Sequence, residues 1–548
     1  MVLSKSFSRS DILELIWEAV PIGSSDPTNS ITLSRLSKLT QDLINISGHR
    51  SLSIDPFSEV YDRQIILDRV QVQSALKDKV ILVTGGQGFV GTNLIAKLKQ
   101  FGIKRIISVD ISTDRSQQVA IDRTETDENI PVTYYYSDVR DSLIKSHSIS
   151  GVSALSTVQL RRSTAAESLE NIFAVEQPQI VFHLAAERLP GLAEIQIHQT
   201  VSTNILGCDR VIRLCEEYQV ESCIFSSTGK ASRYFTPDIY AASKKISEWL
   251  FSDNSQPRTC QYGIVRFTHV VENSPVSSDL DLRVANGLVS LHAPDRYIYT
   301  QNIAESVNLL LNALTIIEPG QTKLLAVKDL GWPINTLDLA LHKILSSGRD
   351  IPIYFKGLPA GYERHVFLGQ LDLSGDRDVL PMLNVLEADC SEISRFGDMV
   401  IATISPFDPD VLHQWVAKIK AAILSTDAAI KQTVIDSQKE IVLSSFIRAN
   451  PARLRDILRW GLNSPELSAA DVDPRDDRDI VALLVKGVEI AEIHQDPAKA
   501  IESNSPAIVT AVVRSYSGDV IQYRQSQRLA KNRVRGKKDL DPIVSDLG

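Results

Sequence analysis

A tyrosine and a lysine stand four residues apart in a segment with the pattern of a helix, Tyr240-Ala241-Ala242-Ser243-Lys244. Residues at this spacing share one helix face, so the phenol and the ammonium are expected to lie close together. A phenol has a pKa of about 10 and is a poor base at neutral pH, but a nearby positive charge favours phenolate. The pair is therefore a candidate general base that takes a proton from a substrate hydroxyl while hydride leaves.

The strand predicted before this helix ends in three hydroxyl side chains, Ser226-Ser227-Thr228. One of them can hydrogen-bond the same reacting oxygen, and we favour Thr228, with Ser227 second. Lys230 follows in the loop. It is a candidate for proton transfer or for binding a substrate phosphate, against the plainer interpretation of a solvated loop lysine.

Glycines recur in a turn that follows a short apolar strand, Val80–Val83, and opens a helix. The set Gly86-x-Gly88-x-x-Gly91 fits the dinucleotide fingerprint. Such glycines make a tight turn, let the backbone approach a pyrophosphate and let the helix pack against the sheet, while the helix N-terminus attracts the anion. We therefore expect NAD or NADP to bind here. The residues of the turn are Gly85, Gly86, Gln87, Gly88, Phe89, Val90 and Gly91.

Two acidic residues end the next predicted strands. Asp110 stands 19 residues past Gly91, where a carboxylate can bind the ribose hydroxyls of the adenosine. Asp138 and Val139 follow the third strand, where the adenine edge is expected. Asp110 favours NAD, but Arg115 nearby could accept a 2′-phosphate, so NADP stays open.

Strands and helices alternate from Lys79 onward, which predicts a parallel sheet with helices on both faces. The expected strands are 80–83, 105–109, 132–136, 180–182, 222–226, 263–267 and 323–327. The expected helices are 92–101, 199–217, 240–251, 303–314 and 335–346. Residues 145–168, rich in Ser and Thr, are expected to be an insertion on the surface.

The composition is that of a soluble globular protein. The chain has 548 residues, 43% hydrophobic and 23% charged, with a net charge of −9, which argues against nucleic-acid binding. We see no membrane-spanning run and no signal peptide, and expect a cytoplasmic location. The five cysteines contain no CxxC pair, so they are expected to be reduced thiols, with no metal site.

The chain divides into three predicted parts. Residues 1–75 form a helical N-terminal extension, and residues 76–425 form the core, with a cofactor part (76–260) and a mostly later substrate part (261–425). Residues 426–548 form a helical C-terminal extension with a basic tail at 524–538. The expected fold class is α/β: a Rossmann-type doubly wound parallel sheet with a smaller mixed α/β substrate subdomain and helical extensions. We also expect a homo-oligomer.

Taken together, several motifs resemble the extended short-chain dehydrogenase/reductases. These are the glycine turn, His183-Leu184-Ala185-Ala186, Asn204-x-x-Gly207, Ser227-Thr228 and the Tyr240/Lys244 pair. The closer resemblance is to the CapD-like polysaccharide-biosynthesis branch of UDP-N-acetylglucosamine 4,6-dehydratases and epimerases, over about residues 60–425. The segments that carry it are Asp62–Asp68, Leu189-Pro190 with Glu194, Ser227–Ala231, Ile351–Glu363 and Val379–Pro381.

The sequence also departs from that branch on the substrate side. Gly229 stands where the dehydratases have an acid that the resemblance implies protonates the departing hydroxyl, which puts water elimination in doubt. His269 replaces an Asn after the Arg266-Phe267 pair, and the family's Arg is replaced around Pro359. The segment 187–190 is one residue shorter, and the substrate loop after Phe267 is contracted. A different sugar, or a different small molecule, is one consequence.

The resemblance implies further site residues. Ala185 and Ala186 would line the cofactor pocket, His183 would shape it rather than transfer protons, and Asn204 would support the surroundings of Lys244. Substrate contacts are implied for Glu187, Arg296 (as a diphosphate ligand) and Glu363.

The predicted function is NAD(P)-dependent modification of a nucleotide sugar: oxidation of a sugar hydroxyl at C4, then epimerisation or dehydration. In this scheme Tyr240 is the base, Lys244 lowers its pKa and holds the ribose, and Thr228 positions the hydroxyl. One alternative is an oxidoreductase acting on a non-sugar metabolite in a specialised pathway. The other is a cofactor-binding scaffold that has lost catalysis.

Overall fold

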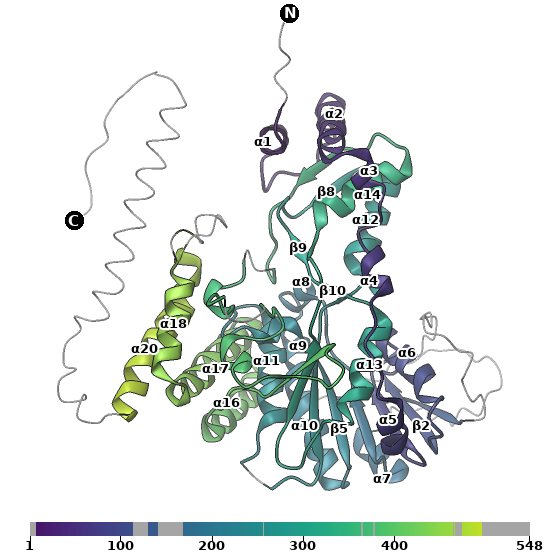
Figure 1. Cartoon of the computed structure of the whole chain (residues 1–548), viewed down its shortest axis with the longest axis vertical. Helices are drawn as coiled ribbons and strands as arrows, with labels where there is room; N and C mark the ends of the chain where they lie inside the picture. The colour runs from purple at the N-terminus through teal and green to yellow at the C-terminus, as the bar shows by residue number, and fades with distance from the viewer. Residues whose placement is uncertain are drawn as a thin grey trace, which may run out of the picture.

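The computed structural model describes residues 7–112, 130–140, 168–255, 257–362, 365–375, 379–463, 465 and 474–495. Figure 1 shows three regions: a sheet flanked by helices, a smaller part that carries the N-terminal helices, and a group of C-terminal helices beside the sheet. The predicted insertion at 145–168 and the basic tail at 524–538 lie almost wholly outside the described residues, as does Arg115.

One sheet organises the first region. Among the described residues it has nine strands in the order β14-β15-β11-β6-β5-β4-β1-β2-β3. The seven strands from β11 to β3 are parallel, and β15 and β14 add an antiparallel edge. The strands are β1 (Val80–Thr84), β2 (Arg105–Asp110), β3 (Val132–Tyr136), β4 (Ile180–His183), β5 (Ser222–Thr228), β6 (Gln261–Phe267), β11 (Lys323–Val327), β14 (Glu392–Ile393) and β15 (Met399–Ala402).

Helices cover both faces of this sheet. Every residue of β1 and β4 is buried, which explains why both strands are apolar up to their last residues, Thr84 and His183. One face carries α6 (Phe89–Leu98) and α13 (Ile303–Ala313), which pack against each other. The other carries α7 (Leu169–Glu176), α8 (Pro190–Ala193), α9 (Ile197–Val201), the π-helix η1 (Ser202–Leu206), α10 (Gly207–Glu217) and α11 (Ile239–Ser252). The predicted Rossmann-type fold is confirmed.

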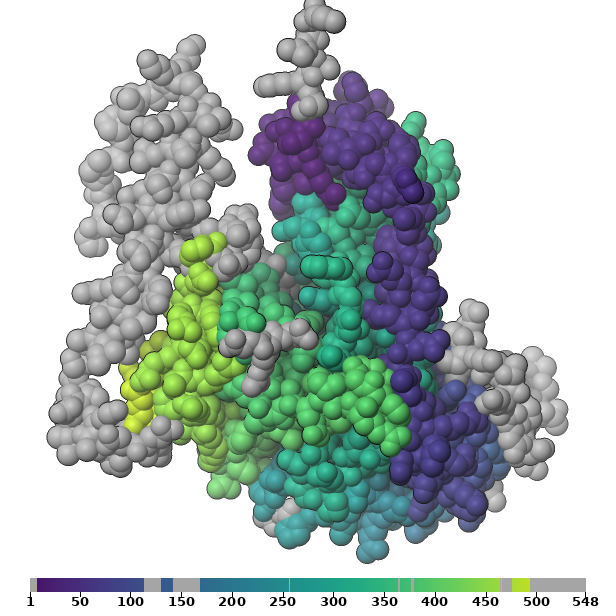
Figure 2. All heavy atoms as spheres, viewed as in Figure 1, coloured from purple at the N-terminus to yellow at the C-terminus, as the bar shows by residue number. Residues whose placement is uncertain are grey.

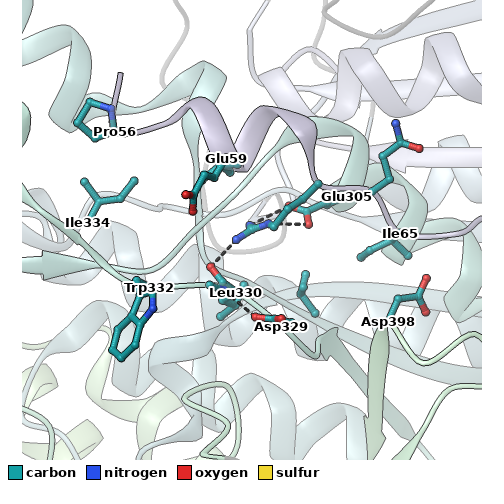
Figure 3. A pocket seen from close by; sticks show the side chains of 14 residues that line it. Pro56, Glu59, Ile65, Glu305, Asp329, Leu330, Trp332, Ile334 and Asp398 are labelled. Carbon is teal, nitrogen blue, oxygen red and sulfur yellow. Dashed lines mark hydrogen bonds and ion pairs between the residues drawn. The ribbon is translucent and has the colours of Figure 1, made fainter. Parts of the chain in front are cut away.

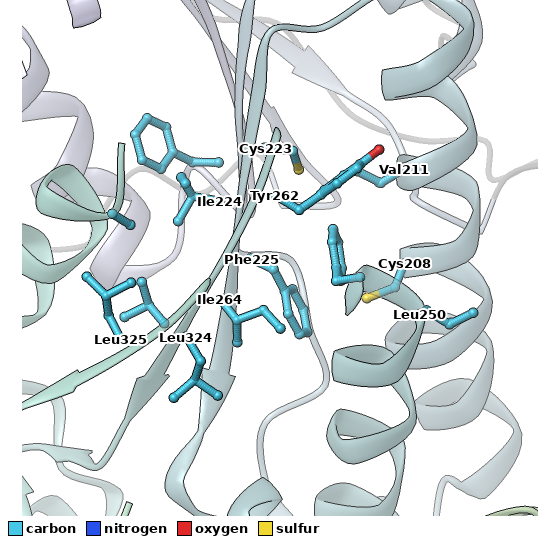
Figure 4. Packing of buried hydrophobic residues seen from close by; sticks show 14 of the residues in the cluster. Cys208, Val211, Cys223, Ile224, Phe225, Leu250, Tyr262, Ile264, Leu324 and Leu325 are labelled. Carbon is cyan, nitrogen blue, oxygen red and sulfur yellow. The ribbon is translucent and has the colours of Figure 1, made fainter. Parts of the chain in front are cut away.

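Aliphatic and aromatic side chains fill the space between the sheet and these helices (Figure 4). Phe225 and Phe251 stack with ring centroids 4.5 Å apart. Cys208 and Cys223 are buried in this core, as are Cys215 and Cys260, and all are free thiols. They act as small apolar residues, as the sequence predicted.

The smaller part combines segments from distant regions of the chain. Helices α1 (Arg9–Ala19), α2 (Ser30–Ser47) and α3 (His49–Leu52) share one hydrophobic core with α12 (Pro275–Asn286), α14 (Thr336–Ser347) and the β8–β13 pair. Figure 2 shows the N-terminal helices in purple lying directly on the green surface of this part. Here β8 (Val289–Leu291) pairs in parallel with β13 (Ile353–Phe355). Two further strand pairs are β7 (His269–Val270) with β10 (Thr300–Gln301), and β9 (Tyr297–Ile298) with β12 (Ile334–Asn335).

An extended segment, residues 60–68, connects the N-terminal helices to the sheet and runs along α13. Three asparagines of α13 or its N-cap donate side-chain amides to its carbonyls: Asn302 to Val60 and Arg63, Asn308 to Ile65, and Asn312 to Ile66. The Arg63 guanidinium binds the Glu305 carboxylate at 3.1 Å and the Leu330 carbonyl (Figure 3). The first residues of this segment are the last turn of α4 (Ser58–Asp62), and the segment leads into α5 (Arg69–Leu76).

The described part of the C-terminal region, residues 409–463, 465 and 474–495, is mainly helical. Its helices are α16 (Pro409–Ala422), α17 (Asp427–Arg448), α18 (Pro451–Gly461) and α20 (Arg478–Gln495). Helix α17 packs against α11 of the sheet region and against α16 and α20. No helix of the described ranges is long and apolar enough to cross a membrane. The three-part domain division stays a prediction.

Candidate active site

The glycine turn joins β1 to α6 at the carboxyl edge of the sheet. Gly85 has φ +70°, a left-handed conformation that favours glycine, and its N–H donates to the Val109 carbonyl at 2.8 Å. A Cβ at Gly85 would lie 2.8 Å from the Ala185 nitrogen, and one at Gly91 would lie 2.3 Å from the Gly85 carbonyl oxygen. Both contacts are with backbone, which cannot move aside. The spacing of these glycines is therefore required by the turn itself.

Helix α6 begins just beyond the turn. Its N-cap is Gly88, which is exposed although the residues on either side are buried. The N–H groups of the first helical turn point past this residue together with the positive end of the helix dipole. A Cβ at Gly88 would fill the approach to the turn, where its nearest contact is the Gly85 oxygen at 3.2 Å. This arrangement fits the pyrophosphate of a dinucleotide.

Asp110 ends β2 beside this turn. One carboxylate oxygen accepts the Gln87 N–H at 3.0 Å and the other accepts the Ser112 N–H at 2.9 Å. The Gln87 side-chain amide donates to the Ser112 carbonyl at 2.6 Å. Because two N–H groups hold the carboxylate, its remaining lone pairs have a fixed direction in which ribose hydroxyls can donate.

Asp138 and Val139 follow β3. Asp138 forms a bidentate pair with Arg140, with contacts of 2.6–3.0 Å. Val139 is buried, and a Cβ at Gly207 would come within 2.9 Å of its Cγ2 atom. The glycine of the Asn204-x-x-Gly207 motif thus allows α10 to pack against the loop that carries Asp138.

His183, at the end of β4, is fully buried. Its ring nitrogens contact the Thr84 hydroxyl at 2.7 Å and the Cys208 sulfur at 3.3 Å. Burial, with the charge of Lys244, lowers the pKa of His183 to about 3, so the ring is neutral. With both nitrogens bonded inside the core, the ring supports Thr84, whose hydroxyl also accepts the Ala185 N–H at 3.3 Å.

Tyr240 opens α11, and the Thr228 side chain at the end of β5 lies close enough to its phenol to lower the pKa of Tyr240. Burial raises the pKa of Tyr240, while the Thr228 hydrogen bond and the positive charge of Arg188 act in the opposite direction. Ser227 points to the other face of the strand and donates to Glu248 at 2.7 Å. The geometry thus places Thr228, rather than Ser227, beside the phenol.

Lys244 is also buried. Its ammonium donates to the Ser226 carbonyl at 2.7 Å and lies 4.4 Å from the centre of the Phe225 ring. Burial lowers the pKa of Lys244 to about 8. In this arrangement its charge is directed at the end of β5, and Arg188 supplies the positive charge that acts on the phenol.

Asn204 lies in the π-helix η1. Irregular helical turns of this kind are frequent at functional sites. Its side chain accepts the Glu187 N–H at 2.9 Å, donates to the Glu187 carbonyl at 3.0 Å and donates to the Ser243 hydroxyl at 2.9 Å. Asn204 therefore joins the Ala185-Ala186-Glu187 segment to α11. The Glu187 carboxylate accepts from Gln199 at 2.6 Å.

Lys230 and Arg296 lie near an aromatic pair. The Tyr362 ring stands 4.9 Å from that of His292, and the Lys230 ammonium lies 5.8 Å from the Tyr362 ring centre. Burial, then the charge of Arg296, lowers the pKa of His292, which places Arg296 near this pair. Glu363 lies outside the described residues.

Gly229 has a distinctive neighbour. A Cβ built at this position would lie 2.7 Å from the sulfur of Met382, which is 2% exposed. Met382 is held through its carbonyl, which accepts from the Arg266 guanidinium at 2.7 Å. The space that an acidic side chain would need beside Thr228 is therefore occupied by the Met382 thioether.

Arg188 and His269 are site residues whose roles the sequence reasoning missed. Arg188 acts electrostatically on both Tyr240 and His269, and burial with this charge lowers the pKa of His269 to about 4. The Arg188 position, two residues after the Ala-Ala motif, was the available signal.

A pocket of about 320 Å³ lined by Arg63, Glu305 and the 91%-exposed Trp332 lies elsewhere, along the 60–68 segment, and contains none of the predicted site residues (Figure 3).

The sheet order, the glycine turn and the Tyr-x-x-x-Lys helix together define an extended short-chain dehydrogenase/reductase. A family model described as "Polysaccharide biosynthesis protein" matches residues 81–368, more than half of the chain, and the chain belongs to this family. The predicted resemblance to the CapD-like branch is confirmed.

Curated relatives agree. The chain is 26% identical to the capsular polysaccharide biosynthesis protein CapD of Staphylococcus aureus over 301 residues, which cover 54% of this chain and 46% of that one. It is 21% identical to the probable polysaccharide biosynthesis protein EpsC of Bacillus subtilis, covering 61% and 52%. It is 29% identical to an inverting UDP-N-acetylglucosamine 4,6-dehydratase of Campylobacter jejuni, covering 35% and 49%. The chain thus spans about half the length of these relatives.

Among solved structures, Pen from Bacillus thuringiensis is similar to this chain, with a TM-score of 0.45 at 19% identity over 60% of this chain and 90% of that one. Another is a UDP-glucose 4-epimerase of Thermus thermophilus in complex with NAD, with a TM-score of 0.38 at 19% identity, covering 50% and 85%.

Proposed function

We propose that the protein is an NAD(P)-dependent enzyme that oxidises a hydroxyl of a nucleotide-linked sugar to a transient ketone and returns the hydride after epimerisation. The observation that carries the proposal is the position of Thr228 and Tyr240 beside each other at the same carboxyl edge of the sheet as the glycine turn. A phenol joined to a second hydroxyl provides a proton acceptor and a hydrogen-bonding partner for one substrate oxygen.

The chain's own residues divide the work. Gly85, Gly88 and Gly91 shape the turn that fits a dinucleotide pyrophosphate, and Asp110 fits its adenosine ribose. Bound nicotinamide supplies the hydride acceptor for such an oxidation. Tyr240 takes the hydroxyl proton, and Thr228 orients the hydroxyl. Lys244 lies one turn after Tyr240 on α11 and donates to the Ser226 carbonyl, and Arg188 favours the phenolate.

Epimerisation is favoured over dehydration by the surroundings of Gly229. Elimination of water needs an acid to protonate the departing hydroxyl, and the resemblance implies such an acid at position 229. Here that position has no side chain, and the Met382 thioether fills the space. Re-addition of hydride to the ketone needs no acid there, since the phenol returns the proton.

The names of the relatives support this substrate class. They include a UDP-N-acetylglucosamine 4,6-dehydratase and a UDP-glucose 4-epimerase of Halalkalibacterium halodurans, which is 24% identical over 157 residues. We propose that this chain likewise binds NAD(P) and acts on a nucleotide sugar.

The test uses the full chain with UDP-N-acetylglucosamine and UDP-glucose. Purified protein is denatured, the released cofactor is identified, and the sugar products are separated by chromatography. We expect an epimer without net NAD(P)H formation, and Tyr240→Phe should reduce turnover by about 100-fold or more while cofactor stays bound. Tyr136→Phe, a 51%-exposed tyrosine, is the matched control.

Three results would redirect the proposal. A 4-keto-6-deoxy product would show that dehydration survives without an acid at Gly229. Accumulation of free NAD(P)H would favour the alternative oxidoreductase. Cofactor binding with no turnover of any nucleotide sugar would favour the scaffold without catalysis.

A further inference from the structure

Helix α11 carries Tyr240 as its second residue, and the support of its first turn comes from outside the helix. The Ile239 N–H, at the first helical position, donates to the Glu194 carboxylate at 2.7 Å. Glu194 follows α8 and is 45 residues away in the chain, and its side chain is only 6% exposed. A carboxylate here satisfies one of the free N–H groups of the helix and complements the helix dipole.

The second oxygen of Glu194 is bound by the C-terminal region. It accepts from the ammonium of Lys431, on α17. The same end of α17 also contacts α9, the helix that follows Glu194: the His198 N–H donates to Asp427 at 3.3 Å. The carboxylate that caps the catalytic helix is thus paired with a cation more than 230 residues further along the chain.

Helix α17 also holds the loop that leads into Tyr240. Gln438 lies seven residues after Lys431, two helical turns on and therefore on the same face. Its amide donates to the Thr236 carbonyl at 2.9 Å and accepts the Thr236 N–H at 3.4 Å. Gln438 is fully buried, and Thr236 is 3% exposed. The side chain pairs with the loop backbone as a neighbouring strand would.

Two aromatic contacts extend this attachment. The Tyr234 ring meets Phe446 edge-on with centroids 5.4 Å apart, and the Lys439 ammonium lies 5.3 Å from the centre of the Phe235 ring. Three successive loop residues, 234–236, therefore contact α17 directly, and the helix start at 239 contacts it through Glu194.

We propose that α17 is a positioning element of the active site, in which Lys431 and Gln438 hold the backbone that places Tyr240 against Thr228. The proposal rests on the function proposed above for Tyr240. It gives α17 a role in catalysis that acts through the backbone of residues 234–239.

Lys431 has a second consequence, through charge. Without the Lys431 ammonium, the negative charge of Glu194 would have no partner. Because Glu194 binds the N–H of the residue before Tyr240, this charge would oppose phenolate formation. The charge that acts on the phenol is that of Arg188, on the loop after β4. Lys244 on α11 donates to the Ser226 carbonyl, Lys230 on η2 (Gly229–Ser232) lies 5.8 Å from the Tyr362 ring centre, and Asp238 is the N-cap residue of α11. None of these changes when Lys431 is replaced.

The experiment compares Lys431→Met, Lys431→Arg and Gln438→Leu in the full chain. The matched controls are Lys420→Met, which removes an ion pair between α16 and Asp209 on α10, and Gln432→Leu, which replaces an exposed glutamine of α17 bonded only within its own helix. The readouts are kcat and KM for UDP-N-acetylglucosamine or UDP-glucose, the pH profile of kcat, and amide hydrogen exchange of residues 234–242 in ligand-free protein.

Gln438→Leu is expected to lower kcat about tenfold with KM nearly unchanged, since two buried backbone groups lose their partners. Lys431→Met should move the acidic limb of the profile up by about one pH unit, and Lys431→Arg should restore it. Both Gln438→Leu and Lys431→Met should speed exchange at 234–242 relative to their controls.

Exchange and kinetics matching those of the controls would overturn the positioning role. Because exchange is measured without substrate, this outcome is separate from a failure of the nucleotide-sugar proposal. If the wild-type protein turns over neither sugar while exchange is faster in both variants, the attachment of α17 to residues 234–239 is supported and the proposed function is refuted.

Discussion

Replacement of Lys244 by methionine should make the protein more stable at neutral pH while it reduces turnover. Lys244 is a buried ammonium with one hydrogen bond, to the Ser226 carbonyl, and one aromatic neighbour, Phe225. Methionine has a similar length and no charge, so it can occupy the same space without the cost of removing an ammonium from water.

The size of the effect follows from the depressed pKa. Burial lowers the pKa of Lys244 from 10.5 to about 8. Each unit is worth about 1.4 kcal/mol, so at pH 7 the charged lysine costs the native state about 3 kcal/mol relative to the unfolded chain. The cost is complete below the folded pKa, and it falls as pH rises toward the unfolded pKa, to about 1 kcal/mol at pH 9.5. The lost hydrogen bond offsets about 1 kcal/mol.

Urea denaturation of wild type and Lys244→Met at pH 7 and pH 9.5 measures both values. We expect the variant to be more stable by about 2 kcal/mol at pH 7 and nearly equal at pH 9.5. Lys420→Met, at a lysine 49% exposed, is the control and should show no such pH dependence. A destabilised Lys244→Met at pH 7, or a difference independent of pH, would refute the reasoning.

Three further predictions concern the cofactor turn, the buried ion network and the phenol. Gly91→Ala places a Cβ 2.3 Å from the Gly85 oxygen, so NAD(P) content after purification should fall at least about tenfold; normal content would contradict the assigned turn. Arg266→Met removes the guanidinium that pairs with two fully buried carboxylates, Glu248 and Glu387, and leaves Glu387 with only the Lys245 ammonium at 3.7 Å, so it should cost about 3–5 kcal/mol by urea denaturation; a neutral effect would exclude a structural ion network. Arg188→Met removes the positive charge that lowers the pKa of Tyr240 and should shift the acidic limb of the pH profile upward; an unshifted limb would show that this charge does not act on the phenol.

Much of the fold was predictable because its signals are local. The unbroken apolar run of β1 and the glycines after it define a buried parallel strand and its turn from neighbouring residues alone. Helix α11 was likewise expected over 240–251 and is observed over Ile239–Ser252. Such elements depend on periodicity and on residues that the backbone itself requires.

Other features depend on contacts between distant residues. Ser227 and Thr228 are equivalent in sequence, but they point to opposite faces of β5, and Glu248 on α11 binds the Ser227 hydroxyl. From the sequence we could favour Thr228 over Ser227, but we could not tell to which face of the strand each side chain points. The attachment of Gln438 to Thr236 spans 202 residues and leaves no local pattern. The contact of Met382 with position 229 likewise joins residues far apart in the chain and leaves no local pattern.

The sharing of one core by the first three helices and by residues 271–355 has a consequence for biosynthesis. Their apolar side chains, Ile16 and Leu36 among them, emerge from the ribosome well before Phe355, with which they share a core. At about 5–20 residues per second, the delay is roughly 15–60 s. During that time the nascent N-terminus exposes a hydrophobic surface, which a chaperone of the holdase type can bind until the later strands arrive.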